Sequence, residues 1–156
     1  MTKITTVVLI LLASSTGATQ TIEDIEARLE GYMAAFNDQN TDLIANTFLG
    51  HPVTVNLGQS ITILNTPDES AQFMAQYFEQ LNQSGWTNTK GRDFDICVMS
   101  DSLVFLDNEY SRFKADGTAI DPAIRRTLQV WQKFDDSWRL VAFYFHHEDV
   151  RVGCGQ

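Results

Sequence analysis

The most informative stretch of this sequence is Lys133-Phe134-Asp135-Asp136-Ser137-Trp138-Arg139-Leu140-Val141. Aromatic and aliphatic side chains flank a polar turn, and Asp and Ser are residues that favour turns. The runs on both sides are rich in the aromatic and β-branched residues typical of strands. The pattern predicts a hairpin near the end of the chain, with strands at residues 125–134 and 138–147.

Two more strands precede this hairpin. Strand-like runs cover residues 87–99 and 103–113, and Ser100-Asp101-Ser102 supplies the turn between them. The late strands carry apolar residues on both faces, so the predicted sheet needs cover on both sides. Helices can cover one face, and a second subunit can cover part of the other.

The first half of the chain reads as three helices and a small hairpin. Helical spacing of apolar residues begins at Thr21, and a shorter helix, capped by Thr41, covers residues 41–48. Short β-prone runs between residues 53 and 64 indicate the hairpin. Thr66-Pro67-Asp68-Glu69 then marks a helix start, with a capping Thr, Pro at the first helical position and Glu three residues after the cap.

This order of elements resembles the nuclear-transport-factor-2-like (NTF2-like), or SnoaL-like, superfamily over about residues 20–149. The terminal hairpin and the strand Val53-Thr54-Val55 carry most of the resemblance. The resemblance implies an α+β cone in which three N-terminal helices pack on a curved antiparallel sheet. Its members include isomerases, dehydratases, cyclases, epoxide hydrolases and non-catalytic binding or assembly domains, so the fold constrains function weakly.

The residues of one well-understood branch of the superfamily are missing. In the ketosteroid-isomerase-like branch a Tyr and an Asp hold the developing enolate, and a second Asp moves the proton. Matching the motifs places Ala34, Leu57 and Val130 at those three positions. Tyr32 and Tyr110 are alternative donors that nothing in the sequence selects. We therefore do not expect that isomerase mechanism.

The resemblance also implies which side chains line a cavity. Because side chains alternate along a strand, it places on the cavity side Phe143, Phe145 and His147, together with Arg126, Leu128 and Val130, and less directly Asp107 and Glu109. Tyr32 joins them from the first helix as a candidate ligand contact. Such a cavity is mostly apolar, with a few polar groups near its mouth, as in many pockets for small molecules.

His147 and Glu109 are the candidate catalytic pair. A carboxylate can fix the tautomer of an imidazole and raise its basicity, which gives a general acid–base unit. The alternative is that His147 lies solvated at a strand end and that Glu109 is a surface charge.

We expect neither a metal nor a cofactor. His146-His147-Glu148-Asp149 is rich in potential ligands, but adjacent strand residues point to opposite faces, so one ion cannot readily take both histidines. The sequence contains no phosphate-binding Gly loop, dinucleotide fingerprint or Gly-x-Ser-x-Gly motif.

The N-terminal residues predict export. Residues 1–18 combine one Lys, a short apolar run and a small-x-small site at Thr16-Gly17-Ala18, as in a signal peptide. We expect a signal peptide at 1–18, a domain at 19–150 and a C-terminal tail at 151–156, with the mature protein periplasmic or extracellular. No later segment is long and apolar enough to span a membrane.

Charge and cysteine content add two expectations. The net charge is −9, which repels phosphate backbones and makes nucleic acid a poor partner. In an exported chain, the two cysteines Cys97 and Cys154 permit one disulfide. Two free thiols, or pairing between chains, are the alternatives.

The sequence therefore predicts an exported protein with a cavity for a small apolar molecule, and it leaves open whether the protein is an enzyme. If it catalyses, acid–base chemistry on a small carbonyl or hydroxyl compound is the expected class. The alternative is a non-catalytic binding or assembly domain that acts as a homodimer through the outer face of the sheet.

Overall fold

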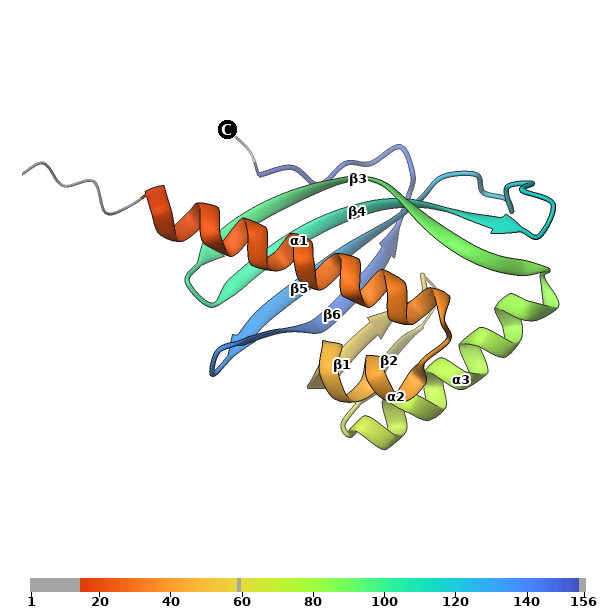
Figure 1. Ribbon diagram of the computed structural model, residues 1–156, viewed down its shortest axis with the longest axis horizontal. Coiled ribbons are helices and arrows are strands. Elements are labelled where there is room, and N and C mark those ends of the chain that lie inside the picture. The colour runs from red at the N-terminus through yellow and green to blue at the C-terminus, as the bar shows by residue number, and fades with distance from the viewer. Residues whose placement is uncertain (1–14, 59, 155–156) are drawn as a thin grey trace, which may run out of the picture.

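The computed structural model describes residues 15–58 and 60–154. These residues form helices first and then a long-stranded sheet, in the predicted order (Figure 1). The helical elements are α1 (Ser15–Asn37), α2 (Thr41–Leu43), the π-helical turn η1 (Ile44–Phe48) and α3 (Pro67–Gln83). The strands are β1 (Leu49–Asn56), β2 (Ile61–Leu64), β3 (Trp86–Ser100), β4 (Leu103–Lys114), β5 (Arg125–Phe134) and β6 (Ser137–His146).

The described strands form one curved six-stranded sheet in the order β2-β1-β6-β5-β4-β3. The hairpins β1–β2, β3–β4 and β5–β6 are antiparallel, and so is the pair β4–β5. The expectation of an antiparallel sheet needs one correction, because β1 pairs parallel with β6. The chain passes through α3 and the four intervening strands between β1 and β6, which is enough chain for a parallel connection.

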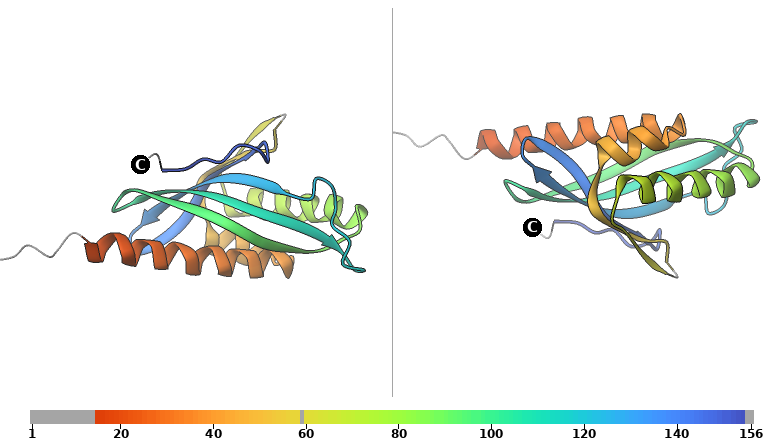
Figure 2. Two further views of the ribbon diagram at one scale, coloured as in Figure 1. Left: turned by 90° about the horizontal axis from the view of Figure 1, so that it is seen from above. Right: turned by 90° about the horizontal axis from the view of Figure 1, so that it is seen from below.

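The two faces of the sheet have different covers. Helix α1 lies along one face, which we call the inner face, and the C-terminal segment runs across the opposite, outer face (Figure 2). Helix α3 packs beside α2 and η1 and reaches β3. The core between the helices and the inner face is apolar and largely aromatic. It includes Ile25, Phe36, Phe78, Trp86, Leu106, Trp131 and Leu140.

Local capping signals predict some helix starts better than others. The Thr66 hydroxyl accepts a hydrogen bond from the Glu69 amide at 3.2 Å, so α3 begins at the expected cap. In α2 the cap is Asn40 and not Thr41, because the Asn40 side chain accepts from the Leu43 amide at 3.0 Å. Helix α1 begins at Ser15, before the expected Thr21.

The N-terminal prediction falls mostly outside the described residues. Of the predicted signal peptide, only Ser15–Ala18 belongs to the described part, where these residues form the first turn of α1. Among the helices of residues 15–58 and 60–154, none combines the length and the apolar character needed to cross a bilayer.

One irregularity in β6 decides which residues face inward. Trp131 pairs with Leu140, and Val130 pairs with Ala142, so Val141 has no partner on β5. Such a β-bulge shifts the alternation of side chains by one residue. Leu140 and Phe143 therefore both face the helices, although they are three residues apart.

Candidate functional site

A central cavity lies between α1, α3 and the inner face of the sheet. The space open to a water-sized sphere is about 40 Å³. Most of the lining side chains are apolar or aromatic, and the rest carry amide, hydroxyl or guanidinium groups. They are Tyr32, Met33, Phe36, Met74, Tyr77, Thr89, Asn108, Tyr110, Arg112, Thr127, Gln129, Leu140, Phe143 and Phe145.

Arg112 of β4 is the permanent charge in this lining. The residue is only 8% exposed. Its Nη2 donates a hydrogen bond to the Tyr77 hydroxyl at 2.6 Å. Its guanidinium carbon lies 5.4 Å from the ring centres of Tyr77 and Tyr110 and 6.0 Å from that of Phe36. Aromatic faces attract a cation, so these three rings help to hold the guanidinium in place. Among the described residues, no carboxylate forms an ion pair with Arg112.

Two buried tyrosines add hydroxyl groups to the lining. Burial raises the pKa of Tyr32 well above its ordinary value, and it does the same to the pKa of Tyr110. Both phenols therefore stay protonated at any physiological pH. They can donate hydrogen bonds, but they cannot readily act as bases.

The polar groups of β5 differ in how far they are satisfied. The Gln129 side-chain oxygen accepts from the Trp131 indole at 3.0 Å. The Thr127 hydroxyl is buried and has no hydrogen-bond partner among the described residues, and the same holds for Arg112 Nε. Buried polar groups in folded proteins nearly always have partners. Two such groups in the lining of one cavity can therefore bond a molecule that enters it, either water or a ligand.

Three of the predicted ligand contacts line the central cavity. Tyr32 reaches it from α1, and Phe143 and Phe145 reach it from β6. The rings of Phe143 and Phe145 meet edge to face, with their centres 6.1 Å apart. The structure thus brings these three side chains together as expected.

Arg126, Leu128 and Val130 require a correction. The resemblance placed these three residues in the cavity, but the β5 side chains that line the cavity are those of Thr127 and Gln129. The Val141 bulge is the cause. Without it, Leu128 would pair with Phe143 and share its face; with it, Leu128 pairs with Tyr144 on the outer face.

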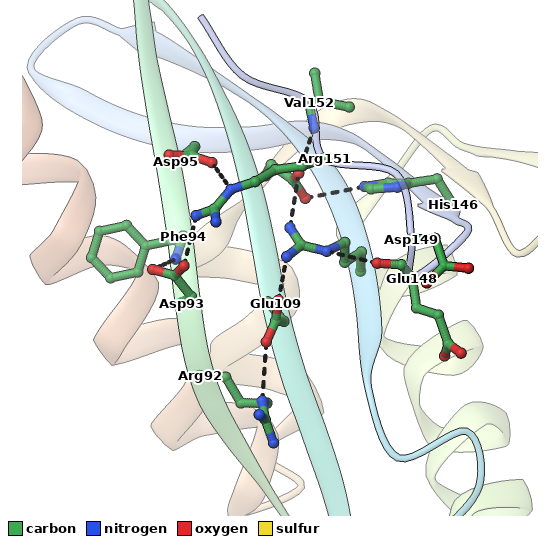
Figure 3. A network of polar contacts seen from close by, with 12 residues as sticks. Arg92, Asp93, Phe94, Asp95, Glu109, His146, Glu148, Asp149, Arg151 and Val152 are labelled. Carbon is green, nitrogen blue, oxygen red and sulfur yellow. Dashed lines mark hydrogen bonds and ion pairs between the residues drawn. The ribbon is translucent and has the colours of Figure 1, made fainter.

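The predicted pair of His147 and Glu109 does not form in the described part of the chain. His147 is exposed, and its Nδ1 lies 3.5 Å from Asp149. Glu109 lies on the outer face, where it contacts Arg92 and Arg126 (Figure 3). Asp107, which we had also considered for the cavity, lies on that outer face too.

Asp107 is the centre of a buried polar network on the outer face, and Figure 3 labels members of this network such as Glu109, His146 and Val152. Its carboxylate is fully buried and accepts from Arg126 Nη1 at 3.1 Å and from the Val152 amide at 2.7 Å. It also lies 3.1 Å from His146 Nε2. Arg126 is paired in turn with Glu109 and donates from Nε to the Glu148 carbonyl at 3.1 Å.

This network holds residues 147–154, the C-terminal strap, against the sheet. Arg151 contacts Asp93 and Asp95 of β3. Cys97 and Cys154 form a disulfide across a Cα–Cα distance of 5.3 Å. The two cysteines are therefore paired within the chain, and neither is a free thiol. Within residues 15–58 and 60–154, no group of three or more His, Cys, Asp or Glu side chains is arranged to hold a metal ion.

Arg112 and Thr127 are the residues that sequence reasoning missed. The spacing of Tyr110 and Arg112 on one strand does show that they share a face. It does not show which face is inside, because that depends on the Val141 bulge in β6.

Comparison with known proteins agrees with this architecture. Residues 23–148 match the family described as NTF2-like protein (DUF6841). The match covers most of the chain, and this protein belongs to that NTF2-like family. The resemblance read from the sequence is therefore confirmed. No curated protein matches the sequence.

Solved structures share the fold at low sequence identity. Aln2 from a Streptomyces species is 11% identical with a TM-score of 0.66, covering 83% of this chain and 92% of its own. A Catenulispora acidiphila structure in complex with S-DNPA is 13% identical with a TM-score of 0.64, covering 81% and 92%. A putative scytalone dehydratase from Novosphingobium aromaticivorans is 11% identical with a TM-score of 0.64, covering 89% and 95%.

Proposed function

We propose that this protein binds a small, largely apolar molecule in the central cavity. The observation that carries the proposal is an aromatic-walled cavity that holds buried polar groups without partners among the described residues, Arg112 Nε and the Thr127 hydroxyl. Small-molecule sites combine an apolar wall with a few such oriented polar groups. The solved complex of the Catenulispora acidiphila neighbour supports the idea that this fold can accommodate a ligand.

The composition of the cavity favours binding over acid–base catalysis. The lining residues that the structure describes include neither a carboxylate nor an imidazole. Tyr32 and Tyr110 stay protonated because burial raises their pKa values, and Arg112 is a permanent cation. These groups can hold an oxygen atom of a ligand, but none is suited to remove a proton at neutral pH.

Ligand-detected NMR with toluene tests this proposal. Toluene should bind saturably to the wild-type protein, because its ring matches the aromatic wall once the half-buried side chains at the edge of the cavity shift to admit it. Met33→Trp should abolish binding by filling the cavity from its half-buried edge. Met99→Trp is the matched control, since Met99 is exposed on β3. No saturable binding, or equal binding by both variants, would refute the proposal.

The outer face supports the alternative of a homodimeric binding or assembly domain. Ile61 and Ile63 of β2 are 64% and 58% exposed. The register of the sheet places Ile63 and Val130 on the same face, and Val130 is half-buried there. Native mass spectrometry should then find a dimer that a double Ile61→Glu/Ile63→Glu variant dissociates. A wild-type monomer at tens of micromolar would rule this alternative out.

We also propose that residues 1–18 direct export to the periplasm or the extracellular space. The Cys97–Cys154 disulfide supports this, because disulfides persist in oxidising compartments. Expression of the full chain in a secreting host should release a protein whose intact mass is that of a chain starting at Thr19. A retained, uncleaved chain would contradict the proposal.

A further inference from the structure

The two faces of the sheet each bury an arginine, and the two arginines are paired differently. On the outer face, Arg126 contacts the carboxylates of Asp107 and Glu109 and donates to a backbone carbonyl (Figure 3). On the inner face, Arg112 is equally buried but donates to one neutral group, the Tyr77 hydroxyl. Of these two arginines, only the outer one has a counter-charge among the described residues.

An unpaired buried arginine is costly to the folded protein. A guanidinium cannot lose its proton in a protein, so burial cannot neutralise it. Removing a charge from water without a counter-charge is unfavourable by several kcal/mol. Aromatic faces compensate for part of this cost. An anion that enters the cavity would compensate for the rest.

The remaining donors define the charge and size of that anion. Arg112 Nε has no partner among the described residues, and the buried Thr127 hydroxyl of the same cavity also has none. The lining that the structure describes contains no second cation. A single negative charge therefore matches the cavity, whereas a doubly charged phosphate would leave one charge unpaired.

We infer that the ligand is a small apolar monocarboxylate, with its carboxylate accepting from Arg112 Nε and the Thr127 hydroxyl. A planar carboxylate is the group that guanidinium donors bind best. The aromatic side chains of the cavity then cover the apolar body of the ligand. This inference rests on the proposed function and narrows it to one chemical class.

Paired probes of the same shape test the inference. We would titrate 3-phenylpropanoate and its neutral analogue 3-phenylpropanamide into ¹⁵N-labelled protein and follow the arginine Nε–Hε signals. The carboxylate should bind about tenfold or more tightly than the amide, as expected for a charge-assisted hydrogen bond. It should also shift the Arg112 signal, which the Arg112→Lys variant identifies by its loss.

Variants separate the charge from the shape of the site. Arg112→Met should remove the preference for the carboxylate, and Arg112→Lys should keep part of it. Arg92→Met is the matched control, because Arg92 is exposed and its partner Glu109 also contacts Arg126. If the Arg112 variants do not fold, Thr127→Val keeps the side-chain shape and should weaken carboxylate binding about threefold or more, as the loss of one hydrogen bond predicts.

The outcomes distinguish this inference from the proposed function. If toluene binds but the two probes bind equally, or if Arg92→Met weakens the carboxylate as much as Arg112→Met does, the inference is overturned and the proposed function stands. If toluene and both probes all fail to bind, both are overturned. Saturable toluene binding together with a carboxylate preference that depends on Arg112 supports both.

Discussion

Removal of the Cys97–Cys154 disulfide should destabilise the protein by about 4 kcal/mol. The bridge joins residues 57 apart in sequence. The chain-entropy relation for a loop of this length gives about 14 cal/mol/K in magnitude, which is about 4 kcal/mol at 25 °C. The folded strap should stay in place without the bridge, because the Val152 amide and Arg151 still contact β4 and β3. The effect therefore comes mainly from the unfolded chain, which gains freedom when the bridge is absent.

Urea unfolding of the double variant Cys97→Ala/Cys154→Ala measures this loss without leaving a reactive thiol. Hydrogen exchange at the Val152 amide is the control for the folded state, and it should stay slow in the variant. A loss below about 1 kcal/mol with an intact strap would refute the reasoning, since it would place the bridge outside the cooperative unit.

Three other changes test the buried polar groups. Asp107→Asn should lower the free energy of unfolding by about 3 kcal/mol, because it breaks the buried pair with Arg126 and leaves that arginine in place. Glu148 joins the network only through its backbone carbonyl, so the control Glu148→Gln should change the free energy of unfolding by less than about 0.5 kcal/mol. Thr127→Val should raise the melting temperature of the ligand-free protein through a gain of about 1 kcal/mol, because it removes a buried hydroxyl without a partner among the described residues. Burial, and then Arg139, lower the pKa of His51; the unfolded chain therefore binds the proton more readily, and stability should fall as the pH drops below about 6.5. His51→Gln should flatten that slope in urea unfolding measured from about pH 5 to 7.5, and an unchanged slope would contradict the assignment.

Most elements of the fold follow from local sequence signals. The cap at Thr66 and the turn at Asp135-Asp136 act within a few residues, so each can be read from the sequence alone. The helical turn η1 ends at Phe48 as expected, whereas β1 begins at Leu49, four residues before the expected Val53. The parallel pairing of β1 with β6 is different, because it joins segments separated by about half of the chain and has no local signature.

The site was harder to predict because it depends on one inserted residue. Counting back from the tight turn pairs Leu128 with Phe143, which agrees with the cavity side that the resemblance implied for both residues. Val141 adds one residue to β6 before that point, so the true partner of Phe143 is Gln129. A single bulge therefore left Phe143 and Phe145 on the cavity side, as expected, and moved every predicted contact on β5 to the other face.

The size of the cavity sets where the parts of a ligand can lie. The 40 Å³ open to the centre of a water-sized sphere is well below the roughly 150 Å³ of an apolar cavity that holds benzene, so it suits a carboxylate group but not the body attached to it. Of the lining side chains, Met33, Tyr77, Phe143 and Phe145 are half-buried, and the others are buried. The apolar body must therefore extend between these four side chains toward the surface, and they must shift to admit it. Tyr77 also accepts a hydrogen bond from the guanidinium of Arg112, so a shift of its ring would release that bond and free a second guanidinium donor for the carboxylate.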